Sequence, residues 1–295
     1  MDYTACALCK RGCKVDRTRG ERGFCGMGDS PVVARAALHY WEEPPISGDR
    51  GSGTVFFSGC SLGCIYCQNR EISHGDGIEI TEARLADIML ELEGGGAHNV
   101  NLVTPTHFVP SVIRAVKDAR SRGLSVPVVY NTGSYDTVET IRALSETVDI
   151  FLPDFKYFRE DSALRYSSAT GYKENALEII REMYRIVGRA RFDENGIMTR
   201  GIIARILLLP GHTAEAKLAL GALYREFGDE IYISLMGQYT PMPGMPAPLD
   251  RRVSHEEYRE LLAYAERIGL KNGFTQELAA ASESFIPPFD YTGVL

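Results

Sequence analysis

The chain has 295 residues, of which 44% are apolar and 24% are charged, and its formal net charge at pH 7 is −7. This length and composition are typical of a globular protein with a sizeable core, built as one large α/β domain with an appendage or as two domains. The net charge argues against nucleic acid as a partner, and no stretch approaches the ~20 apolar residues that cross a bilayer. The first residues are cysteines and basic residues instead of an apolar signal segment, so we expect a cytoplasmic protein without a membrane partner.

All seven cysteines lie in the first 67 residues. In a reducing compartment such clusters are more often metal-binding than disulfide-bonded. Four of them, Cys6, Cys9, Cys13 and Cys25, stand among glycines and basic residues. Four thiolates form a closed coordination sphere, either for a structural zinc or for an iron–sulfur cluster that relays electrons or staples the fold. Zinc, [4Fe-4S] and a segment without metal all stay open as alternatives at this point.

Residues 1–52 are therefore predicted to form a Cys-rich metal-binding segment and a connector. Within the connector, residues 32–38 could be a strand or a short helix, and Pro44-Pro45 ends regular structure. Glu42 and Glu43 are adjacent acids, which we interpret as a solvated or ion-paired turn in preference to a catalytic pair.

The loop after residues 53–58 carries Cys60, Cys64 and Cys67 within eight residues. Three soft ligands on one short loop suit an iron–sulfur cluster, whose irons are held by thiolates. A [4Fe-4S] cube needs four ligands, so one iron would be left open to something other than protein.

The C-x3-C-x2-C spacing, with Tyr66 directly before the last cysteine, resembles the radical S-adenosylmethionine (SAM) superfamily. The flanking runs, residues 41–48 and 51–69, look like its pyruvate formate-lyase-activating-enzyme-like branch. The resemblance implies that the open iron binds the amino and carboxylate groups of SAM. It further implies reductive cleavage of SAM to a 5′-deoxyadenosyl radical that abstracts hydrogen, with Tyr66 near the adenine.

From residue 53 to residue 295, apolar runs alternate with helical patterns, which predicts a parallel sheet. Six such strand–helix units are predicted, which matches the partial (βα)6 TIM-type barrel that the resemblance implies. A proline-rich tail at residues 285–289 is expected to pack over the barrel. Strands are predicted near 53–58, 99–104, 126–131, 148–153, 202–209 and 230–236, and helices near 81–93, 110–121, 137–146, 173–188, 213–226 and 255–267. Thr81 and Ser254 are predicted to cap the first and the last of these helices.

Functional groups collect at the carboxyl ends of the strands in such a barrel. Thr104, Thr106 and His107 follow the second strand, where many radical SAM enzymes carry Gly-Gly-Glu for the SAM amine. The threonine hydroxyls are candidate substitutes, and His107 is either an acid/base or a plain helix-start residue. Asn131 ends the third strand, where relatives contact the SAM ribose or methionine, although Asn-Thr-Gly also suits a simple turn.

Asp154 and Lys156 follow the fourth strand on one side of the chain, so they can pair with each other and hold the methionine end of SAM. Arg205 lies inside the apolar fifth strand and needs a carboxylate partner, that of SAM being one candidate. Further candidates for the substrate side of the pocket follow the fifth and sixth strands: His212, Gln238 and Tyr239.

The function that follows from the resemblance is radical SAM chemistry on a protein substrate, as in glycyl-radical-enzyme activases. A flavodoxin or ferredoxin would supply electrons. Two alternatives stay open: radical SAM modification of a small metabolite, and a non-catalytic iron–sulfur or zinc protein.

Overall fold

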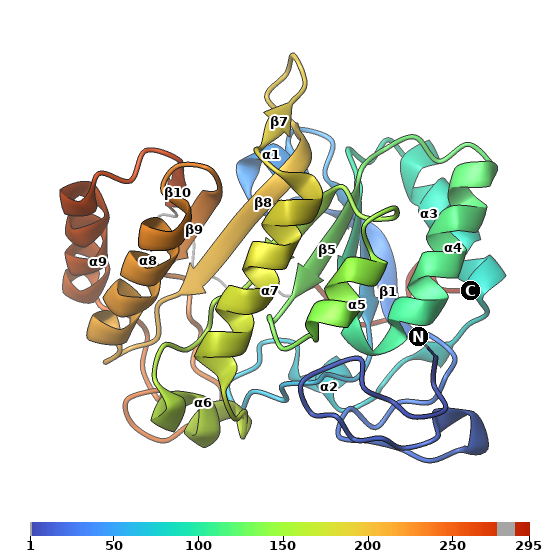
Figure 1. Cartoon of the computed structure of the whole chain (residues 1–295), viewed down its shortest axis with the longest axis horizontal. Coiled ribbons are helices and arrows are strands. Elements are labelled where there is room, and N and C mark those ends of the chain that lie inside the picture. Colours follow the sequence, from blue (N-terminus) through green and yellow to red (C-terminus); the bar gives the residue numbers. More distant parts are fainter. Residues whose placement is uncertain (1, 276–286) are drawn as a thin grey trace.

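A computed structural model describes residues 2–275 and 287–295. Within these residues a ten-stranded sheet runs in the order β10-β9-β8-β6-β5-β4-β2-β1-β3, with β7 paired to β8 (Figure 1). The strands that pair in parallel are β2 (Ser52–Phe57), β4 (Val100–Val103), β5 (Val128–Thr132), β6 (Ile150–Pro153), β8 (Met198–Leu207), β9 (Tyr232–Met236) and β10 (Gly273–Thr275).

The sheet curves without closing, since β10 and β3 stand at its two ends among the described residues. Strand β1 (Val32–His39) pairs antiparallel with β2 and with β3 (Ile78–Glu79), and β7 (Arg191–Phe192) pairs antiparallel with β8. The predicted partial (βα)6 barrel is confirmed. Residues 32–38 belong to a strand, and β10 adds a parallel strand that the sequence analysis did not predict.

The predicted helices are present as α3 (Glu82–Gly94), α4 (Val109–Ser121), α5 (Val138–Ala143), α7 (Tyr172–Val187), α8 (Thr213–Phe227) and α9 (His255–Ile268). Shorter helices that were not predicted are α1 (Pro44–Ser47), α2 (Arg70–Ser73), α6 (Glu160–Ser167) and the 3-10 turns η1 (Arg17–Arg19) and η2 (Thr106–Phe108). The prediction that Pro44-Pro45 ends regular structure is wrong, because both prolines stand in the first turn of α1, where a missing amide donor costs nothing. None of the helices described here combines the length and apolar character that crossing a membrane requires.

Local chemistry explains where the long helices begin. The Thr81 hydroxyl accepts a hydrogen bond from the Arg84 amide at the start of α3, which satisfies a donor that the helix itself leaves unpaired. Ser254 and Glu257 form a complete capping box at the start of α9. Both caps stand where the sequence predicts them.

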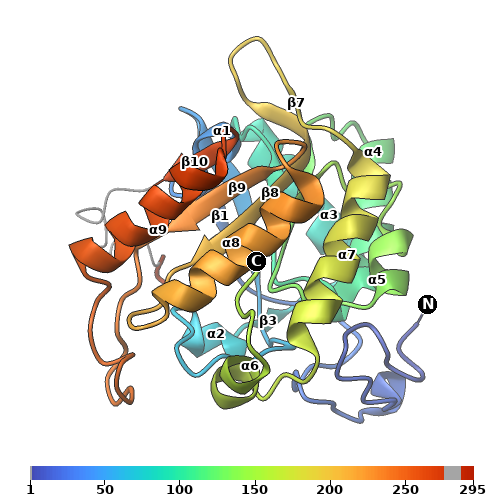
Figure 2. The ribbon, with the colours of Figure 1, turned by 60° about the vertical axis from the view of Figure 1, so that its left-hand side comes forward.

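The core lies between the sheet and the outer helices. Every residue of β2, β4, β5 and β6 is buried, as expected for parallel strands that are covered on both faces. Figure 1 shows the carboxyl ends of β5 and β8 pointing toward the end of the molecule that carries α2 and α6. The N-terminal segment, in dark blue, lies at this same end in both views (Figure 1; Figure 2).

The C-terminal tail lies against the antiparallel side of the sheet. The Phe289 ring packs against Phe56 at a centroid distance of 5.6 Å, and the Ala36 amide donates to the Thr292 carbonyl at 2.8 Å. Of the tail predicted to pack over the barrel, residues 285 and 286 fall outside the described residues. Pro287 lines the cavity described next.

Candidate active site

One cavity of about 250 Å³ lies inside the open barrel. It brings together most of the residues that the sequence singled out, although they come from strands far apart in the chain. Predicted residues that line it are Cys60, Cys64, Tyr66, Cys67, Thr104, Thr106, Asn131, Asp154, Lys156, Arg205 and Gln238.

The loop that follows β2 carries the three cysteines to the cavity wall. Gly59 has a φ of +80°, and a Cβ at this position would lie 2.5 Å from a side-chain carbon of Met27, so only glycine fits here. The Leu62 amide donates to Cys60 Sγ at 3.3 Å, and the Ser167 hydroxyl donates to Cys64 Sγ at 3.0 Å. The loop and the end of α6 (Glu160–Ser167) thus each provide one hydrogen-bond donor to a cysteine sulfur.

Burial has the largest effect on the pKa values of these thiols. It raises the pKa of Cys60 and raises that of Cys67 to about 12. Thiolates buried in this way need a positive partner, which a bound metal supplies.

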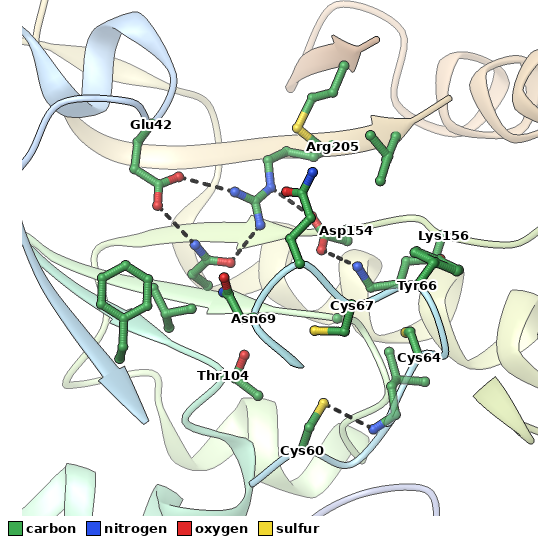
Figure 3. A pocket seen from close by; sticks show the side chains of 18 of the residues that line it. Glu42, Cys60, Cys64, Tyr66, Cys67, Asn69, Thr104, Asp154, Lys156 and Arg205 are labelled. Atoms are coloured by element: carbon green, nitrogen blue, oxygen red, sulfur yellow. Dashed lines mark hydrogen bonds and ion pairs between the residues drawn. The ribbon is translucent and has the colours of Figure 1, made fainter. Parts of the chain in front are cut away.

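A buried group of charges stands opposite the cysteines (Figure 3). Lys156 Nζ donates to Asp154 Oδ2 at 2.6 Å, and Arg205 Nε donates to Asp154 Oδ1 at 2.7 Å. The expected carboxylate partner of Arg205 is therefore a side chain of this chain. Asp154 and Lys156 both face the cavity as the alternation of the strand predicts.

Glu42 completes this group, and the sequence analysis missed it. Its carboxylate accepts from Arg205 Nη1 at 3.1 Å and from Asn101 Nδ2 at 3.0 Å, and Arg205 Nη2 donates to Asn131 Oδ1 at 2.6 Å. Figure 3 shows Glu42 and Arg205 on one side of the cavity and the three cysteines on the other. The sequence suggested a solvated or ion-paired turn at Glu42 in preference to a catalytic pair. The structure contains the ion pair, but Glu42 and its partner Arg205 are mostly buried and line the cavity.

The pKa values follow from burial and pairing. Burial opposes the charge on Asp154, but Arg205 and Lys156 outweigh it, so the pKa of Asp154 lies below its usual value. Burial also opposes the charge on Lys156, and Asp154 outweighs it and raises the Lys156 pKa. Burial raises the pKa of Glu42, and it raises that of the adjacent Glu43 to about 7. Asp154 and Lys156 therefore stay ionised with opposite charges. The carboxyls of Glu42 and Glu43 take up protons more readily than usual.

Backbone strain marks the cavity wall at Thr104. This residue directly follows β4 and has a φ of +58°, a conformation that a β-branched side chain rarely adopts. Its amide donates to the Asn131 carbonyl at 2.8 Å, which ties two strand ends together. Such strain persists only where the surroundings enforce it, and it is commonest at functional sites.

Tyr66 is buried and its ring is enclosed by other tyrosines. The ring centroids of Tyr157, Tyr166 and Tyr239 lie 6.4, 6.2 and 6.3 Å from its own, all near edge-to-face. This packing fixes the ring in the wall of the cavity beside Cys67.

Three predicted substrate-side residues do not line this cavity. His107 is buried, and its Nε2 donates to the Ser58 carbonyl at 2.7 Å. Burial lowers the His107 pKa to about 3, so the ring is neutral. His212 stands between the Pro210 carbonyl and the Tyr166 hydroxyl, beside a separate small cavity. The buried Tyr239 hydroxyl donates to the Leu249 carbonyl at 2.6 Å.

Several lining residues come from segments that the sequence analysis did not connect with a site: His39, Trp41, Glu42, Gln68 and Asn69. The acidic pair before Pro44 was the only local signal for Glu42, and it is equally typical of an exposed turn. Gln68 and Asn69 follow directly after Cys67, and this adjacency could have suggested them.

The four N-terminal cysteines lie apart from the cavity, in the segment docked against the cluster loop. Across residues 2–275 and 287–295, no three cysteine, histidine or acidic side chains are grouped closely enough to hold a metal ion as they stand. This applies to both cysteine sets alike. Binding would therefore require the cysteine side chains to adopt other rotamers.

Comparison with known proteins places the chain in a family. Residues 54–220 match the family model of the radical SAM superfamily. The chain belongs to this superfamily. The match covers more than half of the residues and begins in β2, immediately before the cluster loop.

Individual relatives are more distant. This radical SAM chain is 28% identical to the uncharacterized protein MJ0674 of Methanocaldococcus jannaschii over 280 residues, 91% of this chain and 76% of that one. It resembles the [FeFe]-hydrogenase maturase HydG of Carboxydothermus hydrogenoformans (TM-score 0.52, 13% identity, covering 79% of this chain and 56% of HydG). It also resembles SAM-bound SuiB of Streptococcus suis (TM-score 0.50, 12% identity, 76% and 52%). The chain spans about half the length of these two solved structures, and at such identities the likeness shows the fold alone.

Membership in the superfamily implies an iron–sulfur enzyme that cleaves SAM, with a [4Fe-4S] cluster and SAM as cofactors. The donor set fits this requirement, because three thiols from one loop reach a single cavity. The same cavity holds paired charges that match an amino acid group.

Proposed function

We propose that this radical SAM enzyme removes hydrogen from a protein substrate, in the manner of the pyruvate formate-lyase-activating-enzyme-like branch. Cys60, Cys64 and Cys67 would hold the cluster and leave one iron for SAM. The observation that carries the proposal is that these thiols share one cavity with the Asp154–Lys156–Arg205 group. When bound, the cluster and SAM supply one-electron chemistry that ends in hydrogen-atom abstraction.

The residues of the chain then bind and orient. Lys156 and Asp154 offer opposite charges to the carboxylate and the amine of the methionine end. Arg205, held by Asp154 and Glu42, keeps Asp154 in place and ionised. Thr104 and Thr106 offer hydroxyls at the position where many family members carry a glycine-rich amine site. The tyrosines around Tyr66 exclude water from this side of the cluster.

The rim of the cavity favours a macromolecular substrate. Trp41 lines the cavity, yet it is 51% exposed to solvent. The neighbouring Tyr40 is also 51% exposed. Large aromatic side chains at a rim are typical anchors for protein partners. An electron donor of the flavodoxin or ferredoxin type, in the reducing cytoplasm, belongs to the same proposal.

Anaerobic reconstitution with iron and sulfide tests the cofactor chemistry. With SAM and a strong reductant the protein should yield methionine and 5′-deoxyadenosine. A variant in which Cys60, Cys64 and Cys67 are replaced by alanine should yield neither. Equal yields from both proteins would overturn the assignment of the loop.

Deuterium transfer tests the substrate class. Extract of cells grown in heavy water is separated into protein and small-molecule fractions, and each is added to the reconstituted enzyme with unlabelled SAM. Deuterium in 5′-deoxyadenosine from the protein fraction alone supports a protein substrate. Transfer from the small-molecule fraction alone contradicts it and favours a metabolite.

A further inference from the structure

The N-terminal segment, residues 2–30, folds its four cysteines toward one another. The Cys6 amide donates to the Val15 carbonyl at 3.0 Å, and the Lys14 amide donates to the Cys6 carbonyl at 2.9 Å, which brings the Cys6 and Cys13 turns together. The Phe24 amide donates to Cys13 Sγ at 3.4 Å, which adds the chain around Cys25. Burial, together with smaller contributions from the nearby Cys25, Cys6 and Cys13, raises the pKa of Cys9 to about 12, which shows that the four thiols are neighbours.

A buried cation without a carboxylate partner stands beside this set. Arg17 is only 1% exposed, and its guanidinium donates to the carbonyl oxygens of His107, at 2.6 Å, and of Gly28. Its Nη1 also lies 3.8 Å from Cys6 Sγ. Among the described residues no acidic side chain forms an ion pair with Arg17, and its Nε has no hydrogen-bond partner.

A buried guanidinium in such surroundings lacks an anion. Carbonyl oxygens satisfy individual N–H groups, and the ring centroids of Tyr3 and Phe108 lie 4.6 and 5.6 Å from the Arg17 Cζ, but these neutral partners offset only part of the cost of removing a full positive charge from water. The two cations of the cavity, Lys156 and Arg205, are less buried, with side chains 18% and 12% exposed, and both have carboxylate partners. The sulfur of Cys6 lies beside Arg17, and Arg17 is also close enough to Cys25 to favour its thiolate by lowering its pKa.

The segment also lacks a core of its own. Its regular structure is limited to the three-residue turn η1, and its apolar cluster consists of Tyr3, Cys6 and Leu8 with Val15 packed against them. So small a core does not hold a chain of this length in one conformation without a cross-link. A metal bound by several cysteines is a common cross-link in such segments.

We propose that Cys6, Cys9, Cys13 and Cys25 hold a second metal centre as four thiolates, with Arg17 as its counter-cation. On binding, four thiols release four protons to solvent and form four metal–sulfur bonds. The resulting unit carries about two negative charges with either Zn²⁺ or a [4Fe-4S]²⁺ cluster, so both centres explain Arg17. This inference is independent of the proposed substrate and of the assignment of the cluster loop.

The second centre would lie directly against the cluster loop. Arg11, between Cys9 and Cys13, donates to the Ser61 carbonyl at 2.9 Å and to the Leu62 carbonyl at 3.3 Å. A Cβ on Gly59 would lie 2.8 Å from the Cys25 carbonyl oxygen, which places that part of the segment in contact with the start of the loop. A metal that fixes residues 2–30 therefore also fixes Arg11 over the loop that carries Cys60 and Cys64.

Metal analysis of full-length variants tests the proposal. The protein with Cys60, Cys64 and Cys67 changed to alanine is purified anaerobically and assayed for zinc, iron and sulfide. We expect it to retain about one zinc, or about four irons with matching sulfide, per chain. Adding alanines at Cys6, Cys9, Cys13 and Cys25 should remove that metal. Retention of no more metal than in this seven-alanine protein would overturn the proposal, and the retained element decides between zinc and iron–sulfur.

Arg17 is tested by chelator competition in the same triple-alanine background. Arg17→Met should increase metal loss to a chelator roughly tenfold or more, the equivalent of one lost charge-assisted interaction. Arg17→Lys keeps the charge and should therefore lose metal at nearly the parent rate. This variant keeps the test decisive should Arg17→Met fold poorly. Arg19→Met is the matched control, because the Arg19 side chain is 84% exposed in the same segment. Equal retention in Arg17→Met and Arg19→Met, or a Lys variant as weak as the Met variant, would overturn the role of Arg17.

Discussion

The two cysteine-bearing regions of this molecule are held in place by different means. The cluster loop extends from β2, every residue of which is buried, so the sheet positions Cys60, Cys64 and Cys67 whether or not a metal is present. The N-terminal segment has almost no regular structure and depends on hydrogen bonds to the barrel, such as that of the Lys10 amide to the Tyr135 carbonyl at 2.8 Å. A loop that starts at a strand end has a preorganised backbone, even where its thiols must still turn to bind, whereas a set on an irregular segment needs its ligand to complete the fold.

Loss of one cluster-loop ligand should have the largest effect. Cys64→Ala leaves two thiols on the loop, too few to retain a cluster, and SAM cleavage should fall roughly 100-fold or more. The measurement is 5′-deoxyadenosine formed per chain after reconstitution. Ser167→Ala is the control: it removes the hydrogen bonds of this hydroxyl to Cys64 Sγ and to the Tyr157 hydroxyl but no ligand, so it should keep the iron, with activity within roughly tenfold of the parent. Similar losses in both variants would show that the loop is not preorganised by its strand.

Removal of Arg205 should have the next largest effect, because it breaks a buried charge group. Arg205→Ala leaves Glu42 without its cation and Asp154 with Lys156 alone, which should lower the free energy of unfolding by about 3–5 kcal/mol. Denaturant unfolding measures this. Arg181→Ala, which breaks an exposed pair with Glu226, should cost less than about 1 kcal/mol. If the N-terminal metal content also fell in Arg205→Ala, the two regions would be more strongly coupled than the structure indicates.

Arg11 tests the contact between the two regions. Arg11→Ala leaves the Ser61, Leu62 and Ser167 carbonyls without this donor and should lower the free energy of unfolding by about 2 kcal/mol. It should also speed proteolytic cleavage within residues 2–30, as followed by mass spectrometry. Arg19→Ala, with an exposed side chain, should change stability by less than about 0.5 kcal/mol. Equal protease resistance in both variants would mean that the segment docks without Arg11.

The smallest effect concerns pH and Glu43, a buried carboxyl next to Glu42 in the chain. The pKa of Glu43 is about 7 in the folded protein, against 4.5 as its ordinary value, so between these values the folded state binds more protons than the unfolded state. Stability from this group is therefore complete below about pH 4.5 and is lost as the pH rises through about 7. Glu43→Gln should remove that loss, gaining on the parent by on the order of 2 kcal/mol between about pH 5 and pH 8. Parallel pH profiles of the two proteins would contradict the raised pKa.

Much of the architecture was predictable because it is written in local patterns. Apolar runs between helical periodicities predicted β2, β4, β5, β6, β8 and β9, and capping residues predicted the starts of α3 and α9. Strand β10 is only three residues long, and β1 reads equally well as a helix, so pairing with neighbouring strands decided both. The short helix α6 lacks a side-chain cap and has no comparable signal.

The sequence by itself determined the cysteine chemistry, because three ligands within eight residues are a local pattern that no fold can separate. It also determined that Arg205 needs an acid, since a charge inside an apolar strand requires one. Only the tertiary structure decided which acids: Asp154 and Glu42 stand 51 and 163 residues away and meet Arg205 because the barrel curves around the cavity. The same holds for Arg17, whose burial beside Cys6 and His107 depends on how an irregular segment docks. Local spacing identifies what can bind a metal, whereas long-range packing decides which charges surround it.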